Sequence, residues 1–109
     1  MKDSQNKMLN LKEKPTLKDL QEYIREMCIE RNFKNNADRS KLFAHLLEET
    51  GELASACRKF EKGKRPKEEI ELEISDVLIF LLHIANFYEV DLEEAFRKKE
   101  EINKTRVWN

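Results

Sequence analysis

The sequence predicts an all-α fold, on the evidence of its composition and of the spacing of its apolar residues. Only two Gly and two Pro occur in 109 residues, and 39% of the residues are charged. A sheet needs many turn residues, so this composition favours long helices joined by short turns. The length suits one hydrophobic core. We therefore expect one four-helix domain over residues 15–109, preceded by a flexible polar tail over residues 1–14.

The first two helices are marked by capping residues and by apolar spacing. Thr16 and Asp19 form a capping-box pattern that opens a helix running to about Asn32. Asp38 is a suitable N-cap for a second helix, which Gly63 should end. The apolar face of this second helix comprises Leu42, Phe43, Leu46, Leu47, Leu53, Ala54 and Cys57.

Two further helices follow. Pro66 suits the first turn of the third helix, which we expect to run to about Glu89. Asp91 and Glu94 form a second capping-box pattern that opens the fourth helix. The main apolar face of the third helix comprises Ile70, Ile74, Val77, Leu78, Leu81, Ile84 and Ala85, and that of the fourth comprises Leu92, Ala95, Phe96 and Ile102.

The C-terminal half of the third helix is apolar nearly all round. Beyond the main face it carries Ile79, Phe80, Leu82 and Phe87. A helix that is apolar on every side needs burial on every side. We therefore expect a homodimer or homotetramer in which part of this helix packs against another subunit; the alternative is a central helix wrapped within a monomer.

Charge, hydropathy and cysteine content exclude several classes. Lys and Arg total 21 against 22 Asp and Glu, so the cationic excess expected of a nucleic-acid-binding protein is missing. The longest apolar stretch, residues 77–85, falls well short of the roughly 20 residues that cross a bilayer. Cys28 and Cys57, in a chain without a signal-like start, argue against a disulfide framework and favour a reducing cytoplasm.

Five carboxylates lie on the two central helices. The second helix carries Glu48, Glu49 and Glu52, and the third carries Glu73 and Asp76. At about 100° per residue, Glu49 and Glu73 border the apolar arcs of their helices, and Glu52 and Asp76 lie further round. If the two helices pack antiparallel through these arcs, four carboxylates converge at the edge of the core. Because Glu is abundant in this chain, the alternative is a solvated acidic face.

A convergence of carboxylates calls for a cation, because like charges repel unless a cation or protons neutralise them. Mg²⁺ prefers oxygen ligands and commonly bridges carboxylates to substrate phosphates, and Mn²⁺ is a reasonable substitute. A di-iron site would use Glu-x-x-His motifs, but Leu42 and Phe80 stand three residues before His45 and His83.

Basic residues flank the carboxylates in sequence, in the ranges 58–67 and 97–106. Their proximity to a metal site suits a polyphosphate ligand. The alternative is that basic residues near helix ends serve the helix dipole.

At these residues the sequence resembles the MazG-like, all-α nucleotide pyrophosphohydrolase superfamily. The hallmark of that superfamily is Glu-Glu-x-x-Glu followed by Glu-x-x-Asp, and residues 48–52 and 73–76 match these motifs. Lys99, Asn103 and Arg106 resemble a Lys-x-x-x-Asn-x-x-Arg pattern seen particularly in the dCTP pyrophosphatase branch. The resemblance covers roughly residues 17–108, so the domain over 15–109 is interpreted as MazG-like.

The resemblance implies two groups of site residues and one base contact. The Mg²⁺ ligands would be Glu49, Glu52, Glu73 and Asp76, and the contacts to phosphate or sugar would be Lys99, Asn103 and Arg106. Residues 30–33 look like a family segment ending Arg-Asp-Trp, which makes Phe33 a base-stacking residue; a core position at a helix end is the alternative. A His-x-Pro-Arg stretch of that branch has no match around residues 37–40, so base specificity is not carried over.

We expect this chain to hydrolyse nucleoside or deoxynucleoside triphosphates to monophosphate and pyrophosphate with Mg²⁺, a reaction suited to housecleaning of the nucleotide pool. The metal would polarise the triphosphate and activate a water, and Glu48 or Glu52 would take the proton of that water. Two alternatives stay open: a non-catalytic helical protein-interaction module and a phosphoribosyl-ATP pyrophosphatase.

Overall fold

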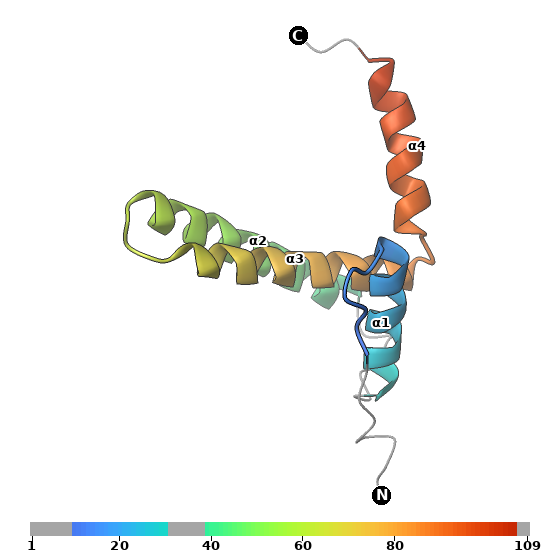
Figure 1. The fold of residues 1–109 in the computed structure, drawn as a ribbon, viewed down its shortest axis with the longest axis horizontal. Helices are drawn as coiled ribbons and strands as arrows, with labels where there is room; N and C mark the ends of the chain where they lie inside the picture. Colours follow the sequence, from blue (N-terminus) through green and yellow to red (C-terminus); the bar gives the residue numbers. More distant parts are fainter. Residues whose placement is uncertain (1–9, 31–38, 107–109) are drawn as a thin grey trace, which may run out of the picture. The chain divides into compact units, whose positions relative to one another are not determined.

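The computed structural model describes residues 10–30 and 39–106, and this part of the chain contains four α-helices and no strand (Figure 1). The helices are α1 (Leu17–Glu30), α2 (Arg39–Glu61), α3 (Lys67–Phe87) and α4 (Leu92–Lys104). The all-α prediction is therefore confirmed. Within the same described ranges, no helix has both the length and the apolar character that a membrane span requires. Two residues singled out in the sequence, Phe33 and Asp38, lie outside the described residues.

The helices form two compact units. The first contains α1, the end of α3 from Ala85 onward, and α4; the second contains α2 and the part of α3 up to Ile84. The two units are described separately below. The expected single domain over residues 15–109 stays a prediction.

Two helix starts use the caps that the sequence predicts. At α1 the pair is reciprocal: the Asp19 N–H donates to Thr16 Oγ1, and the Thr16 N–H donates to Asp19 Oδ2, both at 3.0 Å. At α4 the Asp91 carboxylate accepts the Glu94 N–H at 3.0 Å. These bonds satisfy N–H groups that the first turn of a helix leaves without intrahelical partners.

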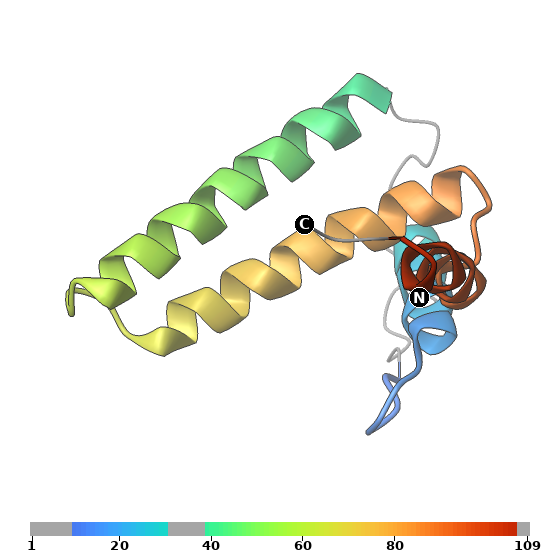
Figure 2. The same cartoon turned by 90° about the horizontal axis from the view of Figure 1, so that it is seen from above.

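The end of α2 is a Schellman motif built on Gly63, which has a φ of 71°. The Gly63 N–H donates to the Phe60 carbonyl at 2.8 Å, and the Lys64 N–H donates to the Lys59 carbonyl at 2.9 Å. A positive φ is accessible to Gly at little cost, so the chain can reverse here. Helices α2 and α3 then lie side by side as an antiparallel hairpin (Figure 2).

The end of α3 repeats this motif without glycine, which is why the helix ends at Phe87 and not at about Glu89 as the sequence predicts. The Glu89 N–H donates to the Asn86 carbonyl at 3.1 Å, and the Val90 N–H donates to the Ala85 carbonyl at 2.8 Å. Glu89 has a φ of 56°. Holding a side chain other than Gly in this region costs on the order of 1 kcal/mol.

The α2–α3 hairpin buries only part of each expected apolar arc, a larger part on α3 than on α2. The partly buried or buried positions include Leu42, Leu46, Glu49, Leu53 and Ala56 on α2, and Glu73, Asp76, Val77 and Phe80 on α3. The remaining arc positions are exposed, among them Phe43 and Leu47 on α2 and Ile74 and Leu81 on α3. The carboxylates therefore lie within the seam between the helices, and not only at the edge of an apolar core.

The four residues expected to make α3 apolar all round differ in their burial. Leu82 is only 2% exposed within this single chain, so it is not available to a second subunit. The remaining three, Ile79, Phe80 and Phe87, are partly buried. The exposed apolar residues of the hairpin instead include Phe43 and Leu47 on α2 and Ile74 and Leu81 on α3.

The strained end of α3 leads to a stability prediction. Replacing Glu89 by Gly should stabilise the protein by up to about 1 kcal/mol, because Gly adopts the positive φ without a steric penalty but loses more chain entropy on folding. Thermal unfolding would measure this. The control is Glu100→Gly at an exposed site inside α4, which should destabilise by about 1 kcal/mol. A loss of stability at Glu89 as large as that of the control would contradict the strain.

Candidate metal centre

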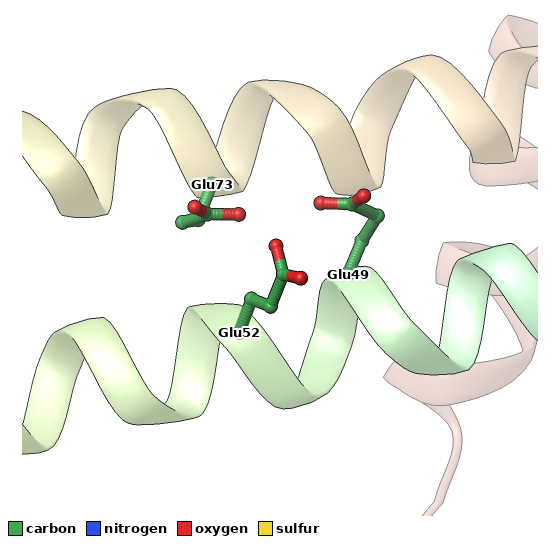
Figure 3. A group of neighbouring side chains, drawn as sticks. All are labelled: Glu49, Glu52 and Glu73. Carbon is green, nitrogen blue, oxygen red and sulfur yellow. The ribbon is translucent and has the colours of Figure 1, made fainter.

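Three carboxylates converge between α2 and α3. Glu49 and Glu52 extend from adjacent turns of α2, and Glu73 extends from α3 toward them (Figure 3). One carboxylate oxygen from each residue lies within 4.8 Å of the other two. Glu49 and Glu52 share a face of α2 because they are three residues apart. The antiparallel hairpin then brings Glu73 of α3 opposite that face.

Two of these carboxylates are only partly accessible to water. Glu49 and Glu73 are partly buried, and the Oε1 atom of each is buried with no hydrogen-bond partner among the described residues. A buried polar oxygen without a partner is costly, and a negatively charged one more so. The arrangement therefore has an unmet requirement for a positive charge.

The electrostatics of the cluster follow from the same burial. Burial raises the pKa of the Glu49 carboxyl, and the negative charges of Glu52, Asp76 and Glu73 raise it further. Burial likewise raises the pKa of Glu73, with the charges of Glu52 and Asp76 adding to the effect. Asp76, which is partly buried on α3, therefore belongs to the same electrostatic group.

Glu69, one turn before Glu73 on the same helix, shows the opposite state. The Arg65 guanidinium donates to the Glu69 carboxylate from Nε at 2.8 Å and also from Nη2. This bond holds the pKa of Glu69 below its ordinary value. One carboxylate of α3 thus has a cation supplied by the chain, whereas burial and the charges of Glu52 and Asp76 are the main influences on Glu73, and no cation is among them.

The donor set of the cluster fits a hard divalent cation. All of its donors are carboxylate oxygens, which suit Mg²⁺, Mn²⁺ or Ca²⁺ better than softer metals. The two buried oxygens without partners are the atoms that a cation would satisfy. Glu49, Glu52 and Glu73, with Asp76 beside them, can therefore hold a divalent metal.

Glu48 is not part of this cluster. It is exposed on α2, and its Oε1 lies 3.3 Å from Nδ1 of His45. The His45 ring in turn stacks on Phe80, with ring centroids 5.4 Å apart. From the sequence, His45 is considered only as a possible di-iron ligand and Phe80 only as an apolar residue of the third helix. Their spacing, four residues before Glu49 and four after Asp76, could have indicated that they meet beside the carboxylates.

The remaining predicted site residues belong to the first unit. Lys99 and Asn103 lie on α4, and Arg106 follows its last residue. Lys99 and Arg106 are exposed, whereas Asn103 is partly buried, with an Oδ1 that has no hydrogen-bond partner in the described part of the chain. These residues and the carboxylates are thus carried by different units.

Comparison with known protein families places this cluster in context. The model of the MazG nucleotide pyrophosphohydrolase domain matches residues 38–106, which include α2, α3 and α4. The chain belongs to the MazG family. Its membership confirms the resemblance that residues 48–52 and 73–76 indicate, and the all-α fold agrees with it.

Individual relatives share this region. The chain is similar to the dATP/dGTP diphosphohydrolase of Cyanophage S-2L, at 42% identity over 65 residues, which cover 60% of this chain and 53% of the relative. It is also similar to dCTP pyrophosphatase 1 of Homo sapiens, at 32% identity over 100 residues, which cover 84% of this chain and 59% of the relative. The Mus musculus protein of that name is 35% identical over 100 residues. The chain thus spans between half and two thirds of the length of these relatives.

The raised pKa of Glu49 predicts a pH-dependent gain on removing its charge. Because the folded state binds a proton more tightly than the unfolded chain, the wild type carries its full repulsion above the raised pKa and loses it as pH falls toward the ordinary value of 4.5. In the absence of metal, Glu49→Gln should therefore raise the melting temperature at pH 7, and this advantage should shrink on acidification.

The matched control for this experiment is Glu71→Gln, at an exposed position on α3. Melting curves from pH 7 down to about pH 5 should show little difference between the control and the wild type, since surface charges contribute little. A Glu49→Gln protein that melts below the wild type at pH 7 without metal would show that the cluster is not repulsive.

Proposed function

We propose that this chain hydrolyses nucleoside or deoxynucleoside triphosphates to monophosphate and pyrophosphate. The observation that carries the proposal is the convergence of Glu49, Glu52 and Glu73 with buried oxygens that have no partner. Family membership supports it, as do the names of the relatives, a dATP/dGTP diphosphohydrolase and a dCTP pyrophosphatase. Housecleaning of the nucleotide pool is the role that such a reaction suits.

The metal ligands in this proposal are Glu49, Glu52, Glu73 and Asp76, with Mg²⁺ as the ion and Mn²⁺ as a substitute. When bound, such an ion neutralises charge on the triphosphate and makes a water molecule more acidic. The carboxylates of Glu49 and Glu73 would hold the ion, because their burial removes competing water. Burial also orients them, since side chains packed between two helices have few alternative rotamers.

The general base in this proposal is Glu52. Its carboxylate belongs to the cluster and is exposed, so an oxygen of Glu52 can take the proton of an attacking water. Glu48 is the weaker candidate of the two that the sequence leaves open, because its carboxylate lies outside the cluster and contacts His45.

Substrate contacts rest on the sequence pattern. Lys99 and Arg106 would meet phosphate oxygens as cations, and the Asn103 amide would bind phosphate or sugar. Phe33 would stack on the base. Two cations and an amide add binding energy without supplying the attacking water, which is why we assign them to affinity.

Self-association is part of the proposal. The exposed apolar residues of the hairpin include Phe43 and Leu47 on α2 and Ile74 and Leu81 on α3. We place them on one side of the hairpin, because they are rotated in the same sense from the carboxylates of their helices and the helices run antiparallel. Leu47 is 73% exposed. A large apolar face of this kind is rare on a monomer and typical of an interface. The proposed assembly is a homodimer or homotetramer.

The proposed chemistry predicts a strict dependence on metal and on the four carboxylates. Changing Glu49, Glu52, Glu73 or Asp76 to its amide should lower pyrophosphate release by about 100-fold or more, because the amide keeps the shape but removes the charge that holds the ion. The assay should screen common NTPs and dNTPs together with phosphoribosyl-ATP. A preference for phosphoribosyl-ATP would show that this chain is the phosphoribosyl-ATP pyrophosphatase of the alternative. Glu71→Gln is the matched control on α3.

The same variants separate an enzyme from a non-catalytic interaction module. Mg²⁺ should raise the melting temperature of the wild type by mass action. At a Mg²⁺ concentration 100 times the dissociation constant, the free energy of unfolding should rise by about 2.7 kcal/mol. Mg²⁺ should stabilise Glu73→Gln less. A wild type that neither releases pyrophosphate nor responds to Mg²⁺ would favour the interaction module, for which the exposed apolar face would then be the binding surface.

The assembly gives a further prediction. Leu47→Glu should convert the oligomer to a smaller species, since a charge buried in an apolar interface without a partner is costly. Light scattering coupled to size exclusion would measure the mass. The control is Lys41→Glu, at an exposed position of α2 that is rotated by about 120° from Leu47. A monomeric wild type at micromolar concentration would disprove the assembly.

A further inference from the structure

We propose that Gln21 is a positioning residue that sets where helix α4 starts and therefore where its substrate contacts lie. This inference rests on the proposed function, because the contacts in question are Lys99 and Asn103. Among the described residues, Gln21 is the one polar side chain that is buried, at 6% exposure. A buried amide on a helix needs specific partners, and those of Gln21 lie in three successive segments of the chain.

Every hydrogen-bonding group of the Gln21 amide is used. Its Nε2 donates to Asn86 Oδ1 at 3.0 Å and to the Val90 carbonyl at 2.8 Å. Its Oε1 accepts the Leu92 N–H at 3.0 Å. The Asn86 amide returns a bond to the Gln21 carbonyl at 3.0 Å. One side chain of α1 thus holds the last turn of α3, the connecting turn, and the first residue of α4.

Apolar burial contributes little to the placement of α4. None of its residues is buried, and Phe96 is 71% exposed. Polar bonds hold its start: the Leu92 N–H donates to Gln21 Oε1, and the Lys18 N–H donates to Glu93 Oε2 at 3.2 Å. The direction of α4 is therefore decided within its first turn.

A small change at this start is amplified along the helix. At 1.5 Å per residue, Asn103 lies about 16 Å from Leu92, so a tilt of about 10° would displace it by about 3 Å. A displacement of 1 Å at a positioned group can already change a rate substantially. Gln21, Asn86 and α4 all belong to the first unit, so the Gln21 amide fixes the start of α4 within that unit.

The decisive variant is Gln21→Met, which keeps a side chain of similar length but removes all three side-chain hydrogen bonds. The matched control is Glu26→Met, at an exposed position on the same helix. Steady-state pyrophosphate release from the best nucleotide, well below the melting temperature, should show KM raised about tenfold for Gln21→Met. Its kcat should stay within about threefold of the wild type, and the control should change neither constant.

Coupling to Lys99 distinguishes positioning from a structural role. Lys99→Ala should raise KM and leave kcat unchanged. Adding Gln21→Met to it should raise KM by less than the tenfold seen in the wild type, because one of the two displaced contacts is already absent. The conservative variant Gln21→Glu keeps the acceptor for the Leu92 N–H but lacks the two N–H donors. It should show an intermediate KM, and it serves as the test protein if Gln21→Met does not fold.

Each failure has its own signature. A wild type that releases no pyrophosphate from any nucleotide overturns the proposed function and this inference together. An unchanged KM for Lys99→Ala in an active enzyme overturns the assignment of α4 as a substrate helix. If Lys99→Ala raises KM but the Gln21 variants change only the melting temperature or the amount of active enzyme, Gln21 is structural and the positioning role is wrong.

Discussion

The repulsion among carboxylates in the seam between α2 and α3 is the constraint on which the rest of this structure depends. Glu49 and Glu73 occupy positions that an ordinary helical hairpin would give to apolar side chains, and Glu52 and Asp76 add negative charge beside them. Burial without a cation raises the free energy of the folded state, whereas a bound divalent ion would turn the same four oxygen donors into a stabilising site. The arrangement therefore fits the proposed metal site better than it fits the stability of the hairpin alone.

The exposed apolar surface follows from the same constraint. Because the carboxylates take part of the seam, each helix is rotated so that one side of its apolar arc faces outward, as Leu47 and Leu81 show. A hairpin that gives its inner face to a polar site must bury its apolar residues elsewhere. In the proposed function, the metal site uses the side of each helix that faces the seam and the subunit interface uses the exposed side, so the stability of the hairpin would depend on both.

The first unit uses a different kind of interaction. Helix α4 carries no buried residue, and polar bonds hold its start: the Asp91 cap and the buried amide of Gln21. Apolar contacts tolerate sliding, whereas a hydrogen bond specifies a donor, an acceptor and a distance. A helix placed by such bonds suits residues that must meet a ligand at defined positions, which is the role proposed for Lys99 and Asn103.

The sequence by itself determined the helices, their caps and the grouping of the acidic residues, because these depend on interactions within a few residues. Thr16 with Asp19, Asp91 with Glu94, and Gly63 act locally, and the motifs at residues 48–52 and 73–76 indicate the family without reference to the fold. Periodicity could also place carboxylates beside an apolar arc. It could not show which part of the arc the partner helix would cover.

The tertiary structure decided the rest, since burial is a property of two surfaces and not of one. It drew Glu49 and Glu73 into the seam and left Glu48 outside the cluster, although Glu48 and Glu49 are neighbours in the chain. It ended α3 early by holding Glu89 at a positive φ, a conformation that local sequence would assign to Gly. It also buried Gln21, whose partners lie more than sixty residues away and leave no trace in local sequence patterns.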